Sequence, residues 1–158
     1  MANIIVVYSG GMDSFTLINK AIKDQHQVKA VAFDYGQKHK KELQFAKNFC
    51  ISSNLEHEII DITNISNLLR GSSLIDEIDI PKGGYEDISM KSTIVPNRNM
   101  ILISLAIGYA VSTNSDEVWF GAHSGDHAIY PDCRPEFVKK MNALSLISDY
   151  KPIKVIVL

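Results

Sequence analysis

The sequence contains little cysteine and no excess of charge of either sign. Its 158 residues include only two cysteines, Cys50 and Cys133, and their separation excludes both a disulfide framework and a zinc motif of the usual spacing. Lys and Arg number 16 against 18 Asp and Glu, so the net charge is −2, without the basic excess of a general nucleic-acid surface. We therefore expect reduced cysteines and no direct nucleic-acid partner.

Long apolar runs are also lacking, since none approaches the roughly 20 residues of a membrane span. The first residues, Met1 to Ile4, do not combine a basic stretch with an apolar segment as a secretory signal does. We expect a cytoplasmic protein with no membrane partner. A hydrophobic content of 46% and a charged content of 22% are ordinary for a globular protein, and 158 residues suit one domain.

Short β-branched runs alternate with segments of helical periodicity. The run NIIVVY is apolar throughout, as in a strand buried on both faces of a parallel sheet. The expected strands are residues 3–8, 28–35, 57–62, 117–121 and 153–158. The expected helices are residues 13–23, 40–53, 99–112 and 135–148, with a short helix at 63–70. This alternation predicts an α/β fold: a Rossmann-like open parallel sheet with helices on both faces, formed by residues 1–158 as a single domain.

Two segments lack clear periodicity. Residues 71–93 contain Pro81, Gly83 and Gly84, and they form either a binding loop or a disordered segment. Residues 121–134 are rich in His, Asp, Tyr and Pro and are expected to be an irregular loop.

The string SGGMDS, from Ser9 to Ser14, stands between the first strand and the first helix. Its glycines allow a sharp turn whose N–H groups, with the helix N-terminus, form a site for phosphate. The hydroxyls of Ser9 and Ser14 can donate further hydrogen bonds, and Asp13 can cap the helix or help to hold Mg²⁺. A plain strand-to-helix turn is the alternative. The Gly-Lys-Ser/Thr ending of a Walker A loop is absent.

Three further strings lie at element ends that should share one rim of the sheet: FDYGQKH (33–39), VPNRN (95–99) and YPDCRPEF (130–137). Each also has a simpler explanation. Pro96, Asn97 and Asp132 suit helix starts, and Arg98 and Arg134 could be surface charges.

SGGMDS resembles the signature of PP-loop ATP pyrophosphatases, which cleave ATP between the α- and β-phosphates. With the other three strings, the chain resembles the 7-cyano-7-deazaguanine synthase family of queuosine biosynthesis from Ile4 to about Leu158. The resemblance implies an adenine nucleotide alpha hydrolase-like fold and a ligase that uses ATP and Mg²⁺. It would convert 7-carboxy-7-deazaguanine and ammonia to 7-cyano-7-deazaguanine through an adenylated acid and an amide. The family also suggests a homodimer.

On this resemblance we expect nucleotide contacts from Tyr8, Ser9, Gly10, Gly11, Met12, Asp13, Ser14, Phe15, Thr16, Phe33 and Asp34. The expected substrate contacts are Tyr35, Gln37, Arg98, Asp132 and Arg134. The expected catalytic residues are Asp13, Arg98, Asp132 and Arg134. The arginine forks suit a carboxylate or the α-phosphate, Asp132 could accept from the guanine-like N–H edge, and Tyr35 could stack on the heterocycle. Asp126 is expected to assist a metal ion or to orient the substrate. The candidates for proton transfer are His39, His123 and His127, and a role in loop structure is the alternative for each.

The chain departs from the family in two places. Members carry a C-terminal cluster of four cysteines that binds zinc, and two scattered cysteines cannot replace it, so we expect no zinc and a chain that is C-terminally short. The last strand would then lie at a poorly protected edge. Phe15 stands where many relatives have Thr or Ser, and Thr16 can compensate.

Two other functions are compatible with the sequence. One is a related PP-loop ligase that acts on another acid, amide or protein terminus. The other is an inactive nucleotide-binding relic. A tRNA-modifying PP-loop enzyme is disfavoured because the basic surface for RNA is lacking.

Overall fold

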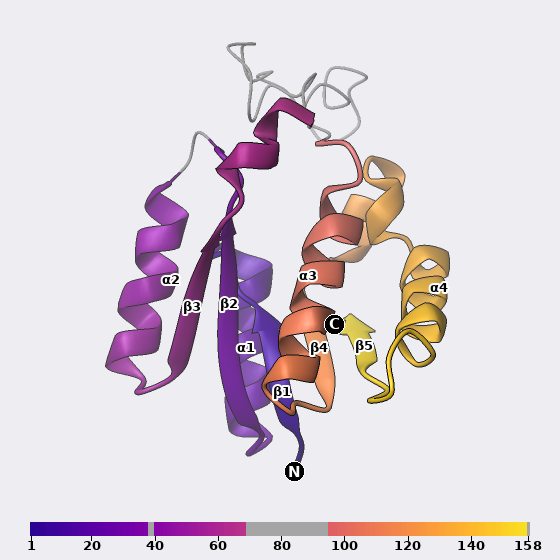
Figure 1. Cartoon of the computed structure of the whole chain (residues 1–158). Helices are drawn as coiled ribbons and strands as arrows, with labels where there is room; N and C mark the ends of the chain where they lie inside the picture. The colour runs from indigo at the N-terminus through magenta and orange to yellow at the C-terminus, as the bar shows by residue number, and fades with distance from the viewer. Residues whose placement is uncertain (38–39, 69–94, 158) are drawn as a thin grey trace.

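Five parallel strands form the single sheet of the computed structural model, which describes residues 1–37, 40–68 and 95–157 (Figure 1). The strand order is β3-β2-β1-β4-β5. The strands are β1 Asn3–Val7, β2 Gln27–Asp34, β3 Glu56–Asp61, β4 Glu117–Phe120 and β5 Lys154–Val157. All neighbouring strands pair in parallel, which confirms the predicted sheet.

Four α-helices cover the two faces of the sheet: α1 Met12–Lys23, α2 Lys41–Ser52, α3 Arg98–Ser112 and α4 Pro135–Ser145. Helices α1 and α2 lie on one face and α3 and α4 on the other, as predicted (Figure 1). Helix α4 ends at Ser145, three residues before the predicted end at 148. In the described part of the chain, no helix combines the length and apolar character needed to cross a bilayer.

Three short 3₁₀ helices complete the described elements: η1 Thr63–Leu68, η3 Ser124–Ala128 and η4 Pro131–Cys133. The expectation of an irregular loop at 121–134 was therefore wrong in part, because His123 and Asp126 form a reciprocal capping box that starts η3. The predicted loop at 71–93 and His39 lie outside the described residues.

The core forms two apolar layers because side chains alternate along the central strand. Ile4, Val6 and Tyr8 pack toward α1 and α2, whereas Ile5 packs toward α3. The side chain of each is at most 1% exposed. The middle of strand β1 is thus enclosed on both faces, and the loop that follows it starts from a rigid support.

The strand order reverses between β1 and β4. The chain runs from β1 outward to β3, then returns through α3 to β4 on the other side of β1. In open α/β sheets the crevice at such a reversal, at the carboxyl ends of the strands, is the usual ligand site. The loop from Ser9 to Ser14 lies at this position.

Candidate active site

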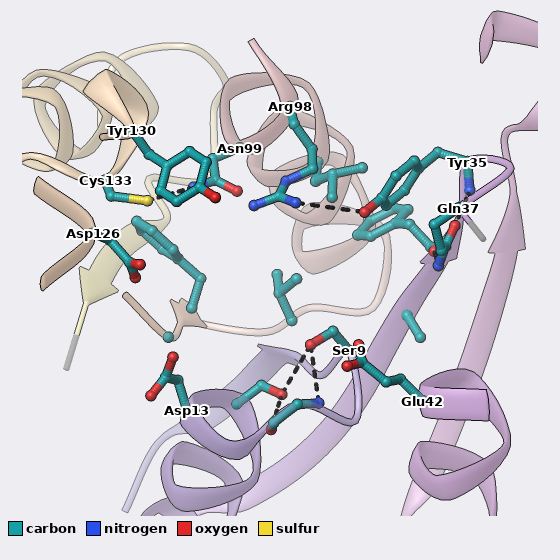
Figure 2. A pocket seen from close by; sticks show the side chains of 18 of the residues that line it. Ser9, Asp13, Tyr35, Gln37, Glu42, Arg98, Asn99, Asp126, Tyr130 and Cys133 are labelled. Atoms are coloured by element: carbon teal, nitrogen blue, oxygen red, sulfur yellow. Dashed lines mark hydrogen bonds between the residues drawn. The ribbon is translucent and has the colours of Figure 1, made fainter. Parts of the chain in front are cut away.

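A pocket of about 370 Å³ opens at the carboxyl ends of β1, β2 and β4 (Figure 2). This volume falls in the range of small-molecule sites. The three strings predicted to share one rim all contribute to its wall, which confirms that prediction, and the loop from Ser9 to Ser14 contributes as well. The residues that line it are Val7, Ser9, Gly11, Met12, Asp13, Ser14, Ala32, Phe33, Tyr35, Gln37, Glu42, Arg98, Asn99, Leu102, Phe120, Gly121, Asp126, Tyr130 and Cys133.

The loop after β1 is held by its own hydroxyls and by a close approach to α2. Ser14 Oγ donates to the Gly11 carbonyl at 2.9 Å, and the Gly11 N–H donates to Ser9 Oγ at 3.3 Å. Gly10 has φ +89°, and a Cβ there would overlap the backbone carbonyl of Glu42. The loop therefore requires glycine at position 10.

Helix α1 starts directly from this loop without a side-chain cap. The N-cap residue is Gly11, and Asp13 lies inside the first turn. The expected capping role of Asp13 was therefore wrong, because the helix begins one residue earlier than predicted. An uncapped N-terminus that faces a pocket favours an anionic ligand through its N–H groups and dipole.

The turn after β2 uses its polar side chains internally. Asp34 accepts from the Gly36 N–H at 3.0 Å and pairs with Lys40 at 3.0 Å. Gln37 accepts from the Tyr35 N–H at 3.0 Å and donates to the Phe33 carbonyl at 3.1 Å. These bonds hold the turn in place and present Tyr35 to the pocket.

Arg98 is the first residue of α3 and reaches across the pocket toward Tyr35, whose hydroxyl oxygen lies 3.5 Å from Arg98 Nη1 (Figure 2). Burial by itself lowers the pKa of Arg98, but the interactions with Tyr35, Asp132 and Cys133 outweigh it and raise the pKa above its ordinary value. None of the ion pairs found within the described ranges includes Arg98. The site thus presents a partly buried cation suited to an anionic ligand.

Asp132 caps α3 from a distant segment. The N-cap residue of this helix, Asn97, makes no side-chain cap bond, and Asp132 Oδ2 instead accepts from the Asn99 N–H at 2.9 Å. Arg134 is exposed, and its Nε donates to the His127 carbonyl at 2.9 Å. Neither Asp132 nor Arg134 lines the pocket. Their side chains bond instead to the start of α3 and to the His127 carbonyl.

Two carboxylates and an imidazole meet at the rim of the pocket: Asp13, His123 and Asp126 have potential ligand atoms within 4.8 Å of one another. His123 Nδ1 accepts from the Gly125 N–H at 2.9 Å, so in the neutral ring Nε2 carries the proton. That nitrogen faces Asp126 Oδ1 at 3.7 Å and Asp13 Oδ2 at 3.9 Å. The cation ligands left are carboxylate oxygens, which fit Mg²⁺.

Five predicted nucleotide contacts are not among the residues that line the pocket: Tyr8, Gly10, Phe15, Thr16 and Asp34. Tyr8 is 1% exposed within the core. The Phe15 ring lies 5.0 Å from the ring of Phe49, and Thr16 Oγ1 donates to the Met12 carbonyl at 3.0 Å. Gly10 packs against the Glu42 backbone, and Asp34 accepts a hydrogen bond within its own turn.

Sequence reasoning missed several lining residues. Asn99 and Tyr130 stood within the quoted strings, and their position beside Arg98 and Asp132 was a usable signal. Glu42 and Leu102 carried no such signal, because they lie near the starts of α2 and α3 and outside the quoted strings.

The two cysteines cannot share a zinc ion. Cys50 belongs to α2 and packs on one face of the sheet, whereas Cys133 packs on the opposite face with residues of α3 and α4. Burial raises the pKa of each thiol to about 11, which favours the protonated form over the thiolate that a metal needs.

Two curated relatives are similar to almost the whole of this chain. The chain is 58% identical over 153 residues to a 7-cyano-7-deazaguanine synthase of Alteromonas mediterranea, covering 97% of this chain and 70% of that relative. It is 59% identical over 152 residues to a 7-cyano-7-deazaguanine synthase of Pseudoalteromonas translucida, covering 96% and 70%.

Solved structures share the fold at lower identity. An NH3-dependent NAD synthetase of Campylobacter jejuni superposes with a TM-score of 0.51 and 24% identity, covering 74% of this chain and 45% of that one. A predicted subunit of tRNA methyltransferase from Methanocaldococcus jannaschii has a TM-score of 0.50 and 14% identity, covering 99% and 67%. The family sequence model described as queuosine biosynthesis protein QueC matches residues 3–157. The chain belongs to the queuosine biosynthesis protein QueC family.

Proposed function

We propose that this chain is an ATP-dependent carbon–nitrogen ligase that converts 7-carboxy-7-deazaguanine and ammonia to 7-cyano-7-deazaguanine. The names of its relatives motivate the choice of substrate. The observation that carries the proposal is the position of Arg98, a cation without an ion pair in the described chain, in the same pocket as the loop from Ser9 to Ser14. One wall suits phosphates and the other suits a carboxylate.

The reaction needs two activations. The substrate carboxylate attacks the α-phosphorus of ATP, pyrophosphate leaves, and ammonia then displaces AMP to form an amide. A second ATP activates the amide oxygen, and loss of AMP and of both N–H protons leaves the nitrile. Arg98 orients the carboxylate and stabilises charge that develops at the reacting centre.

Other lining residues have narrower roles in this proposal. The uncapped first turn of α1 and the hydroxyls of Ser9 and Ser14 hold the phosphates. Asp13 and Asp126 would hold Mg²⁺, which when bound neutralises phosphate charge. Tyr35 provides a flat surface for the heterocycle. All these contacts with nucleotide and substrate stay predictions. They include the contacts of Asp132 and Arg134 with the substrate and those of Tyr8, Gly10, Phe15, Thr16 and Asp34 with the nucleotide.

The proposal extends to the localisation, assembly and substrates of the enzyme. We infer a cytoplasmic enzyme whose residues 1–158 act as one nucleotide-binding unit, which assembles as a homodimer and takes small molecules as substrates. The chain spans about 70% of the length of the relatives it matches. Activity of this chain by itself, without bound zinc, is part of the proposal.

The test is turnover with ATP, Mg²⁺, ammonia and 7-carboxy-7-deazaguanine, followed by mass spectrometry of the nitrile. Arg98→Ala should lower kcat/KM for the acid by about a hundredfold or more, because it removes a charged contact to the reacting group. Lys139→Ala, on the exposed side of α4, is the matched loss of a cation and should leave turnover unchanged.

Three outcomes separate the alternatives. Nitrile formed by the wild type and lost in Arg98→Ala supports the proposal. ATP binding without any turnover points to a nucleotide-binding relic. Cleavage of ATP to AMP that responds to a different acid, and not to 7-carboxy-7-deazaguanine, points to a related ligase.

A further inference from the structure

The side-chain amide of Asn99 is fixed in one orientation. Its Nδ2 donates to the Asp132 carbonyl at 3.2 Å and lies 3.2 Å from Cys133 Sγ. An amide nitrogen has two hydrogens, and both are used. Rotating the amide by half a turn would place its oxygen against the Asp132 carbonyl, so the network defines which atom faces which way.

Within the Asn99 side chain, the carbonyl oxygen Oδ1 is the group left to bind a ligand. Asn99 lines the pocket and follows Arg98 directly in the first turn of α3. Figure 2 shows Oδ1 on the side away from Cys133 and toward Arg98. Within the described ranges, the hydrogen bonds of the Asn99 side chain are the two made by Nδ2. The pocket wall therefore carries a fixed acceptor beside a cationic donor.

This pair complements a primary carboxamide better than a carboxylate. A guanidinium can donate to the amide oxygen while Oδ1 accepts one amide N–H. A carboxylate has no N–H, and its negative oxygens would be repelled by Oδ1. We propose that Asn99 recognises the carboxamide intermediate and holds it, together with Arg98, for the second activation by ATP. This inference rests on the proposed function.

The chemistry explains the need for such a contact. After ammonia displaces AMP, the amide must stay bound while AMP and pyrophosphate leave and a second ATP enters. Its oxygen then attacks the α-phosphorus and pyrophosphate departs. The carbon–oxygen bond breaks with AMP as the leaving group, and both nitrogen-bound protons are released as the nitrile forms. Asn99 is thus a positioning and specificity residue for the second half of the reaction.

The test compares Asn99→Ala with wild type on two substrates, the acid and the synthetic carboxamide. Loss of one hydrogen bond predicts a kcat/KM for the carboxamide that is lower by about tenfold, with the conversion of acid to amide changed by less than about threefold. During turnover of the acid, the variant should release free carboxamide, and the ratio of amide to nitrile should rise. Met100→Ala, at an exposed position of the same turn, is the control and should match wild type.

Two results would overturn the inference. An equal loss on both substrates would mean that Asn99 only supports the pocket wall. If the effect vanishes with analogues that lack the 2-amino group, Asn99 instead reads the edge of the ring. Circular dichroism checks the fold, and Asn99→Ser, with a shorter polar side chain, replaces the alanine variant if that variant unfolds. Wild type that makes nitrile from neither substrate overturns this inference and the proposed function together, whereas wild type active on both with an unselective variant overturns the inference alone.

Discussion

At the scale of single residues, the polar side chains around the pocket differ in where their hydrogen bonds go. Gln37 uses both ends of its amide on the backbone of its own turn, and Asp132 uses its carboxylate on the start of α3. Arg98 has a weak contact with Tyr35 at 3.5 Å and no ion pair in the described chain. A polar side chain whose hydrogen bonds are all made within the protein helps to shape the pocket. A charged side chain without such partners is available to bind a ligand.

Both cysteine thiols are buried, and their burial should make them unreactive. Burial, reinforced by Asp132 and Asp126, raises the pKa of Cys133 from 9.0 to about 11, and burial does the same for Cys50. Two pKa units lower the thiolate fraction at pH 7.5 by about a hundredfold. We expect both cysteines of the native protein to resist iodoacetamide at pH 7.5, as measured by mass spectrometry. Denatured protein, in which both should react, is the control, and rapid labelling of the native chain would contradict the prediction.

At the scale of elements, the pocket depends on how two helix starts are attached. Helix α3 begins after Asn97, whose φ of 50° places it in the left-handed region, and its cap comes from Asp132 in η4. Helix α1 begins from a loop whose Gly10 packs against the Glu42 backbone. In both cases a contact with another segment fixes the direction from which the helix presents its first turn.

Removing the remote cap should weaken the attachment of η4 to α3. Asp132→Ala leaves the Asn99 N–H without its acceptor, and loss of a helix cap costs about 1 kcal/mol. For a domain of this size, that corresponds to a fall in Tm of about 2–4 °C. Thermal denaturation followed by circular dichroism measures it. Asp132→Asn retains an acceptor oxygen and should lose less, and a variant Asp132→Ala as stable as wild type would contradict the assigned cap.

The glycines of α3 and of the loop after β1 should respond to alanine in opposite ways. Gly10→Ala forces a Cβ into the Glu42 carbonyl at a positive φ, so we expect a lower Tm and loss of ATP binding. Gly108→Ala adds a methyl group where no atom lies within 4 Å, so it should stabilise α3 by about 0.5–1 kcal/mol. Calorimetry and nucleotide titration measure both. Equal effects of the two substitutions would contradict this account of the loop.

At the scale of the whole molecule, the sheet was predictable because its three central strands, β1, β2 and β4, are largely buried. Apolar runs such as NIIVVY bounded by turn residues placed every strand within one residue of its observed ends. The shared rim followed from the topology of parallel strands. Contacts between distant segments were not predictable. Nothing local to Asp132 indicates that it caps Asn99, and nothing local to Glu42 indicates that its helix start packs on Gly10.

The stability of the whole molecule should depend on pH through His57 in β3. Burial lowers the pKa of His57, and Lys47 lowers it further, against an opposing effect of Glu58. Its Nε2 is buried, with no hydrogen-bond partner found in the part of the chain that the structure describes. An unfolded histidine has a pKa near 6.5, so between the folded pKa and about 6.5 the unfolded chain binds the extra proton.

Stability is therefore full above about pH 6.5 and falls as the pH drops through the folded pKa. His57→Gln removes this titration while it keeps a polar side chain of similar reach. We expect Tm to fall less between pH 7.5 and 5.5 in the variant than in wild type, measured by thermal denaturation at constant ionic strength. Equal falls would show that the neutral form of His57 is not favoured by folding. A smaller fall would tie the acid sensitivity of the fold to a partly buried imidazole in the edge strand β3, away from the pocket.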